Sequence, residues 1–211
     1  MTDINSTARI RTELENALNK LISAIGSIQI GSSEQFPYGW RKAAKGRTVW
    51  RILEELINQN LEDKHKSYGL SNMEASESEV SVFDFKIQIS NTSRPVFVNI
   101  KSSVKGAKSN KDDISKATGL KGFYDIDLEN EIFIATFVID FKEDMTIQIE
   151  SCHVMPIAWL PDIYVNPSNN GNLQSAKYKN LDQAIKRTNQ QFIAELDKEI
   201  EVSRKKRVAK Y

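Results

Sequence analysis

Two polar side chains on neighbouring apolar segments could do chemistry together: Asp84 in residues 80–90 and Lys101 in residues 95–103. Both segments alternate apolar and polar residues, as β-strands do, so each predicted strand gathers its polar side chains on one face. Residues 91–95 are turn formers, and they are few enough to join the two strands as a hairpin. A carboxylate and an ammonium brought together could bind a hard divalent cation and stabilise negative charge on a phosphate. The pattern therefore indicates metal-dependent hydrolysis of a phosphodiester.

The second predicted strand places an amide next to the lysine. Aliphatic residues occupy positions 96, 98 and 100, so Asn99 and Lys101 share the opposite face of the strand. If the two strands pair, Asp84 approaches the end that carries these side chains. Asn99 offers a neutral carbonyl oxygen where a carboxylate would add negative charge, so metal affinity should fall unless another acid compensates.

This arrangement resembles the PD-(D/E)xK nuclease superfamily and, within it, the orthodox Type II restriction endonucleases (EcoRV/HincII-like). The family motif is an Asp on one strand and a second, hydrophobic strand that ends in Asp/Glu-x-Lys, often followed by small hydroxyl residues. The matching residues here are Asp84 and the run Asn99, Ile100 and Lys101, which two serines follow. Two positions depart from the motif: Phe83 stands where a Pro often precedes the Asp, and Asn99 stands at the second acidic position.

The resemblance covers about residues 40–142 and implies a Mg²⁺ site, with Mn²⁺ as a substitute. Asp84, Asn99 and the main-chain carbonyl of Ile100 would hold the metal. Lys101 would orient or help to deprotonate the attacking water and would stabilise charge in the transition state. Three explanations of Asn99 stay open: natural variation, an engineered replacement of an acid, or a binding protein that has lost catalysis.

A predicted helix upstream could supply the missing acid. Residues 45–61 carry apolar side chains at helical spacing, from Val49 to Leu56, which predicts an amphipathic helix that packs on the sheet. Glu54 and Glu55 are the candidates for a compensating carboxylate at the active site. The alternative is that each of them belongs to a solvated polar face of the helix.

A lysine-rich stretch indicates contacts with the backbone of double-stranded DNA. Residues 101–111 hold four lysines and no acid. Lys105, Lys108 and Lys111 could contact phosphates, which dominate DNA affinity without reading sequence. A solvated flexible loop is the alternative interpretation.

A polar segment near the C-terminus is the candidate for base recognition. Residues 161–180 are rich in Asn, Gln, Ser and Tyr and poor in aliphatic residues, which favours a loop. Amide side chains can pair with adenine and lysines can reach guanine in the major groove. A plain surface loop is again the alternative. The candidate DNA-binding residues are Asn166, Asn169, Asn170, Asn172, Gln174, Ser175 and Lys177.

The composition fits one enzyme domain, and the chain has no overall excess of positive charge that would by itself indicate nucleic-acid binding. The 211 residues include 29 Lys and Arg against 28 Asp and Glu, so the distribution of charge matters more than its total. We expect a single nuclease domain over residues 1–211, with a catalytic core at about 40–142 and a DNA-recognition and dimer-support region at about 150–211. The single cysteine, Cys152, fits a reducing cytoplasm. We expect no membrane span and no signal peptide.

The remaining pattern predicts an α/β fold with a sheet flanked by helices. The resemblance implies that this is a restriction-endonuclease-like mixed β-sheet. We expect a Type II restriction endonuclease that cuts specific duplex DNA as a homodimer, because a two-fold symmetric site calls for two symmetric active sites. The alternatives are a catalytically inactive DNA-binding protein on a nuclease scaffold, or another DNA nuclease such as a repair enzyme or resolvase. The other expected elements are a helix at 7–26, a short helix at 112–120, a central strand at 131–141, a strand at 145–150 and a long helix at 181–206.

Overall fold

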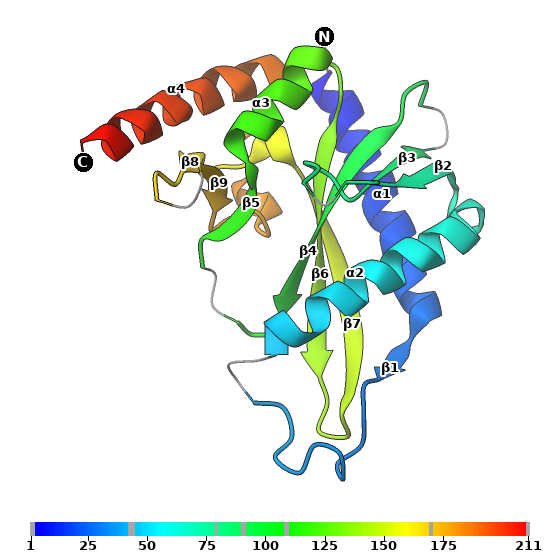
Figure 1. Cartoon of the computed structure of the whole chain (residues 1–211). Helices are drawn as coiled ribbons and strands as arrows, with labels where there is room; N and C mark the ends of the chain where they lie inside the picture. The colour runs from blue at the N-terminus through cyan, green and yellow to red at the C-terminus, as the bar shows by residue number, and fades with distance from the viewer. Residues whose placement is uncertain are drawn as a thin grey trace.

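The computed structural model is a mixed α/β structure in which helices pack on both faces of a central sheet (Figure 1). It describes residues 3–41, 45–78, 80–89, 92–107, 110–168 and 171–209, and only the backbone of residues 45–48. No helix in the described part of the chain has the length and apolar character needed to cross a membrane.

The main sheet has six strands in the order β1-β7-β6-β4-β3-β2. Strands β4 and β6 run parallel, with Phe97 opposite Ile132 and Val104 opposite Ile139, and the other pairs are antiparallel. The predicted mixed sheet and the predicted hairpin between the two motif strands are therefore confirmed. The strands are β1 (Ser27–Gln29), β2 (Leu70–Ala75), β3 (Phe85–Ile89), β4 (Val96–Val104), β6 (Ile132–Phe141) and β7 (Thr146–Pro156).

Helices and a second, three-stranded sheet cover the two faces of the main sheet. Helices α1 and α2 pack on one face, and α3, α4 and the small sheet pack on the other. The helices are α1 (Ile4–Ile25), α2 (Lys45–Lys64), α3 (Ala117–Ile126) and α4 (Asn189–Val208), with 3-10 turns η1 (His65–Tyr68), η2 (Ile157–Trp159) and η3 (Leu181–Gln183). The small sheet has the order β5-β9-β8, from β5 (Asp112–Lys116), β9 (Asn172–Ser175) and β8 (Tyr164–Val165).

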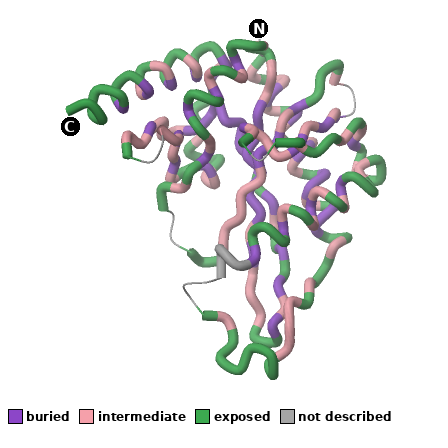
Figure 2. Tube along the Cα trace, viewed as in Figure 1, coloured by how far each residue is buried: buried purple, intermediate pink, exposed green. Residues whose placement is uncertain are grey.

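Strand β6 lies in the middle of the core, as its apolar sequence predicts. Phe133 and Phe137 point into the cluster under α1 and α2, whereas Ile132 and Ile134 point into the cluster under α3 and α4. All of these side chains are buried, and the buried tube in Figure 2 follows this strand through the molecule. A strand buried on both faces is apolar at nearly every position, which is why the alternating pattern is absent here.

Strand β3 is shorter than the predicted strand at 80–90. It begins at Phe85, and residues 80–84 form turns and bends. Asp84 therefore lies just before the strand rather than within it. The main-chain N–H of Asp84 still donates to the carbonyl of Val98 at 2.8 Å. The next donor on β4, the N–H of Ile100, is instead accepted by the Asp84 carboxylate, which takes the place of a main-chain hydrogen bond between the strands.

The predicted short helix at 112–120 is wrong in its first half. Asp112 and Asp113 lie in β5, opposite Ser175 and Gln174 of β9, and the helix begins only at Ala117. Aspartates favour helix N-caps in local sequence, but here pairing with a distant strand overrides that preference.

The polar segment at 161–180 is also more ordered than a loop. It contains β8 and β9, and its buried side chains Val165, Leu173 and Tyr178 join the core beneath α4. The few apolar residues of this segment are therefore buried in the core, although the low aliphatic content of the segment predicts a surface loop.

The final helix is shorter than the predicted helix at 181–206. α4 begins after Thr188, whose side chain forms a capping box with Gln191. The preceding segment is held in an irregular path because the guanidinium of Arg187 donates to the carbonyls of Ala158 and Leu160, at 3.0 and 2.8 Å.

The packing of α2 yields a matched pair of stability predictions. Leu53 is 1% exposed under the sheet, whereas its neighbour Ile52 is 48% exposed. We expect Leu53→Ala to lower the free energy of unfolding by about 2–5 kcal/mol, because it leaves a cavity. Ile52→Ala should cost less than about 1 kcal/mol. Urea denaturation measures both, and similar losses for the two variants would contradict this placement of the helix.

Candidate active site

The site forms at an edge of β4 that its neighbour leaves uncovered. Strand β3 pairs with β4 only from Phe85 opposite Val98 to Ile87 opposite Val96, whereas β4 continues to Val104. Beyond Val98 the Asp84 carboxylate accepts the N–H of Ile100. Because the N–H and carbonyl of one strand residue point to the same side, the carbonyl of Ile100 also faces this edge.

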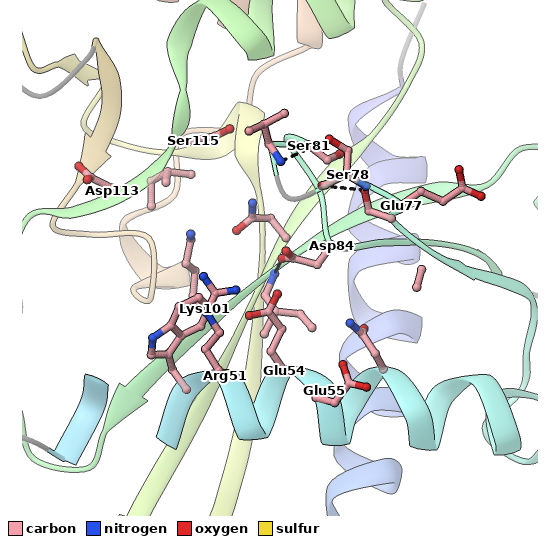
Figure 3. Close-up of a pocket in the computed structure, with 18 of the residues that line it drawn as sticks. Arg51, Glu54, Glu55, Glu77, Ser78, Ser81, Asp84, Lys101, Asp113 and Ser115 are labelled. Atoms are coloured by element: carbon pink, nitrogen blue, oxygen red, sulfur yellow. Dashed lines mark hydrogen bonds between the residues drawn. The ribbon is translucent and has the colours of Figure 1, made fainter. Parts of the chain in front are cut away.

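Helix α2 places a second carboxylate beside Asp84. Val49, Leu53 and Ile57 anchor one face of the helix in the core, and Glu54 projects from the adjoining face toward Asp84 (Figure 3). Burial raises the pKa of Glu54, the charge of Asp84 raises it further, and the two side chains share a hydrogen bond. Glu54 thus lies where the sequence predicts a compensating acid, in the pocket beside Asp84.

Asp84 is more deeply buried than Glu54, and its environment is mixed. Burial raises the pKa of Asp84, while the hydrogen bond from Ile100 and the positive charge of Lys101 act in the opposite direction. Two partly buried carboxylates that face each other are costly unless a cation lies between or beside them. The pair is therefore suited to binding a positive ion.

Lys101 reaches the same pocket from β4. Burial lowers the pKa of Lys101, and the carboxylates of Asp84, Glu54 and Asp113 act against this shift. As predicted from strand alternation, Asn99 and Lys101 lie on the face opposite to Val98, which points into the core beneath α1 and α2.

Asn99 is fixed by the fold rather than free in the pocket. It is 7% exposed, and its Nδ2 donates to the carbonyl of Val82 at 3.1 Å. Its Oδ1 is buried and has no hydrogen-bond partner among the residues that the structure describes, and the same is true of Glu54 Oε2. Both residues line the pocket, so each has an unused oxygen at the site.

These residues surround a cavity of about 560 Å³ (Figure 3). α2 forms one wall, β4 and Asp84 form the floor, and Asp113, Ser115 and Asn172 come from the small sheet on the other side. Within the described ranges, no group of three or more His, Cys, Asp or Glu side chains could hold a metal ion. Asp84 and Glu54 are the two carboxylates that share a hydrogen bond in this cavity, and Glu55, Glu62, Glu77 and Asp113 also line it.

Glu55, the other predicted acid on α2, is placed differently from Glu54. Its side chain is exposed at the rim of the pocket and accepts a hydrogen bond from Gln59 at 2.7 Å. The helix turns by about 100° per residue, so adjacent glutamates cannot point in the same direction.

Of the three predicted phosphate-binding lysines, the two that the structure describes contact different partners. Lys105 forms ion pairs with Glu150 and with Asp140. Lys111 lies over the ring of Tyr164, 4.0 Å from its centre. Lys108 lies outside the described residues.

The predicted base-reading residues have several different environments. Ser175 is fully buried and donates to Asp162, so its hydroxyl is not exposed for contact with bases in this structure. Gln174 donates to Asp113 at 2.6 Å and accepts from Asn166 at 3.3 Å. The remaining candidates are Asn172, which lines the pocket with a buried and unpartnered Oδ1, Lys177, which is exposed, and Asn169 and Asn170, which lie outside the described residues.

Sequence reasoning missed several residues that line the pocket, among them Trp50, Arg51 and Asp113. Trp50 and Arg51 precede Glu54 by four and three positions, so they share its face of the helix, a spacing that the sequence did offer. Asp113 comes from β5, and only the pairing of β5 with β9 brings it there.

Comparisons with known proteins give similarity in structure but not in sequence. No family model and no curated protein matches the sequence. Among solved structures, the NlaIV restriction endonuclease aligns with a TM-score of 0.48 and 15% sequence identity. The alignment covers 80% of this chain, which spans 66% of the length of that protein.

The facing carboxylates predict a pH-dependent stability. The pKa of Glu54 in the folded state is raised above its ordinary value of 4.5, so the folded chain binds its proton more tightly than the unfolded chain. The free energy of unfolding should therefore fall as the pH rises through this range, and the charged Glu54 should destabilise the fold at neutral pH. Glu54→Gln should be more stable than the wild type at about pH 7, with a smaller difference at about pH 4.

Urea denaturation at the two pH values, with EDTA present, measures this difference. The matched control is Glu55→Gln, which changes an exposed neighbour and should shift stability little at either pH. A gain for Glu54→Gln that is equal at both pH values would contradict the assigned electrostatic cause.

Proposed function

We propose that this chain is a Mg²⁺-dependent endonuclease that hydrolyses duplex DNA in the manner of a Type II restriction endonuclease. The observation that carries the proposal is the convergence of Asp84, Glu54 and Lys101 in one pocket at the open edge of β4. These are the two acids and the lysine that the sequence resemblance requires, with one acid supplied from a helix.

The residues present fit a magnesium ion. Mg²⁺ is usually bound in proteins by one or two carboxylates together with phosphate oxygens and waters. Asp84 and Glu54 would supply the carboxylates, and the carbonyl of Ile100 and Oδ1 of Asn99 are neutral oxygens at the same site. A bound Mg²⁺, or Mn²⁺ in its place, would polarise the scissile phosphate and lower the pKa of a coordinated water.

In this proposal Lys101 acts on the phosphate and on the attacking water. Its position on β4, two residues beyond Asn99, holds the ammonium in a largely buried site close to two carboxylates. Charged donors in such sites stabilise developing negative charge more strongly than they do in water. The same group can orient a water molecule for in-line attack.

Glu54 takes the part of the second acid in place of Asn99. The Asn99 amide is already committed to the Val82 carbonyl, and its remaining oxygen carries no charge. The function proposed for the intact enzyme is cleavage of a specific duplex site by a homodimer, because two-fold DNA symmetry calls for two active sites.

Asn99 also favours a second candidate function, a DNA-binding protein that retains the nuclease scaffold without catalysis. A neutral residue at the second acidic position weakens metal binding, and this candidate holds if Glu54 does not replace the missing charge. The two candidates make opposite predictions for cleavage.

Nicking of supercoiled plasmid in Mg²⁺ or Mn²⁺ tests the enzyme. We expect the wild type to cleave, and Lys101→Met and Glu54→Gln each to reduce the rate by at least about 100-fold, because each removes a charged group from the reacting centre. Glu55→Gln is the matched control and should retain activity. Absence of cleavage by the wild type, with specific DNA binding intact, would establish the non-catalytic candidate instead.

Replacing Asn99 with Asp separates an inactivated site from a natural variation. The substitution would set a carboxylate against the Val82 carbonyl and add a third negative charge beside Asp84 and Glu54. We therefore expect Asn99→Asp to lose about 1–3 kcal/mol of stability in denaturation experiments and to gain no activity in plasmid nicking. Cleavage by the Asp variant alone would mean that Asn99 replaces an original carboxylate, and that Glu54 does not compensate.

A further inference from the structure

The segment that leads into α2 has an unusual composition. Residues 35–51 contain five Lys and Arg, four aromatic residues and no Asp or Glu, in a chain whose net charge is only +1. The cations are Arg41, Lys42, Lys45, Arg47 and Arg51, and the aromatic residues are Phe36, Tyr38, Trp40 and Trp50.

The first part of this segment is a loop with a fixed anchor. The indole N–H of Trp40 donates to the carbonyl of Lys142 at 2.9 Å, and its ring packs edge-on against Phe141 with centroids 4.9 Å apart. Phe36 stacks on Trp40 at 6.0 Å. These contacts attach the loop to the turn between β6 and β7, at the lower end of the molecule in Figure 1.

The anchored loop leaves an aromatic and a cation in solvent. Tyr38 is 80% exposed, and the guanidinium of Arg41 lies 5.4 Å from the centre of its ring. Figure 2 shows the loop as largely exposed. Packing explains Trp40, but it does not explain Tyr38, whose ring is presented outward.

A second pair of the same kind stands at the pocket. The guanidinium of Arg51 lies 4.4 Å from the ring centre of Trp50, which is 38% exposed. Both residues line the cavity, and Figure 3 shows Arg51 on the same helix as Glu54. The basic segment thus begins at the exposed loop and ends at the proposed catalytic carboxylates.

We propose that the described aromatic and cationic residues of this segment, Tyr38, Arg41, Trp50 and Arg51, form a surface that binds the phosphate backbone of duplex DNA and directs it into the pocket. The inference rests on the proposed function, of which DNA is the substrate. Charge complementarity supports this partner, since a run of cations without acids attracts a polyanion and phosphate contacts provide most DNA affinity. The surface differs from the lysine-rich stretch at 101–111, where Lys105 is already paired with acids.

The salt dependence of DNA binding tests the surface directly. A short fluorescent duplex is titrated with the full chain in EDTA, so that no cleavage occurs, and anisotropy is followed over a series of salt concentrations. Each phosphate contact contributes about 0.9 to the slope of log K against log salt concentration. We expect Arg41→Gln and Arg51→Gln each to reduce the slope by about 0.9, and the double variant to reduce it by about twice as much.

Two further variants complete the experiment. Tyr38→Ala should weaken binding without changing the slope, because it removes a ring and no charge. Lys20→Gln, at an exposed position on α1, is the matched control and should leave both affinity and slope unchanged.

The results that would reject this surface differ from the results that would reject the proposed nuclease function. If the wild type cleaves plasmid and both arginine variants keep the wild-type salt slope, the proposed DNA-binding surface is rejected and the proposed nuclease function is still supported. A change of oligomeric state in Tyr38→Ala, measured by sedimentation with DNA binding unaltered, would make the loop a contact between copies of the chain. Reduced slopes in a chain that does not cleave would support the surface and reject the nuclease.

Discussion

The candidate site depends on one constraint, the open edge of β4. β3 stops pairing at Val98 while β4 continues to Val104, and an exposed strand edge carries main-chain groups that need partners. The Asp84 carboxylate satisfies the first of these donors, at Ile100, and is thereby fixed against the strand. The position of Asp84, the access of Glu54 from α2 and the direction of the Ile100 carbonyl all follow from this edge.

Electrostatics at the edge explain why a neutral residue can stand at position 99. Asp84 and Glu54 already oppose each other in a partly buried site, with Lys101 as the nearby cation. Another carboxylate would increase repulsion before any cation binds. Asn99 instead uses its amide N–H to hold the Val82 carbonyl, so it fastens the segment that precedes Asp84. Asn99 thus departs from the motif that the sequence resembles, and at the same time it supports the segment that carries Asp84.

Local periodicity was sufficient to predict the core of the site but not its surroundings. Alternation of apolar residues predicts the two paired strands, although Asp84 lies just before β3 and not on it, and helical spacing predicts the amphipathic helix that carries Glu54. The roles of Asp113 and Lys105 depend instead on partners far along the chain, namely Gln174 on β9 for the first and Glu150 on β7 for the second. Such long-range pairings leave no periodic signal, so the local sequence predicts a helix and a loop where the structure has the small sheet.

The anchoring of α2 has a consequence for how the site tolerates change. Leu53, which secures the helix in the core, is the direct neighbour of Glu54, which faces the pocket. Each residue turns an α-helix by about 100°, so the roll of α2 about its own axis determines which side chain meets Asp84. The hydrophobic stripe of this helix therefore sets the alignment of Glu54 with Asp84, and the freedom of its core residues to vary is limited by the geometry of the candidate site as well as by packing.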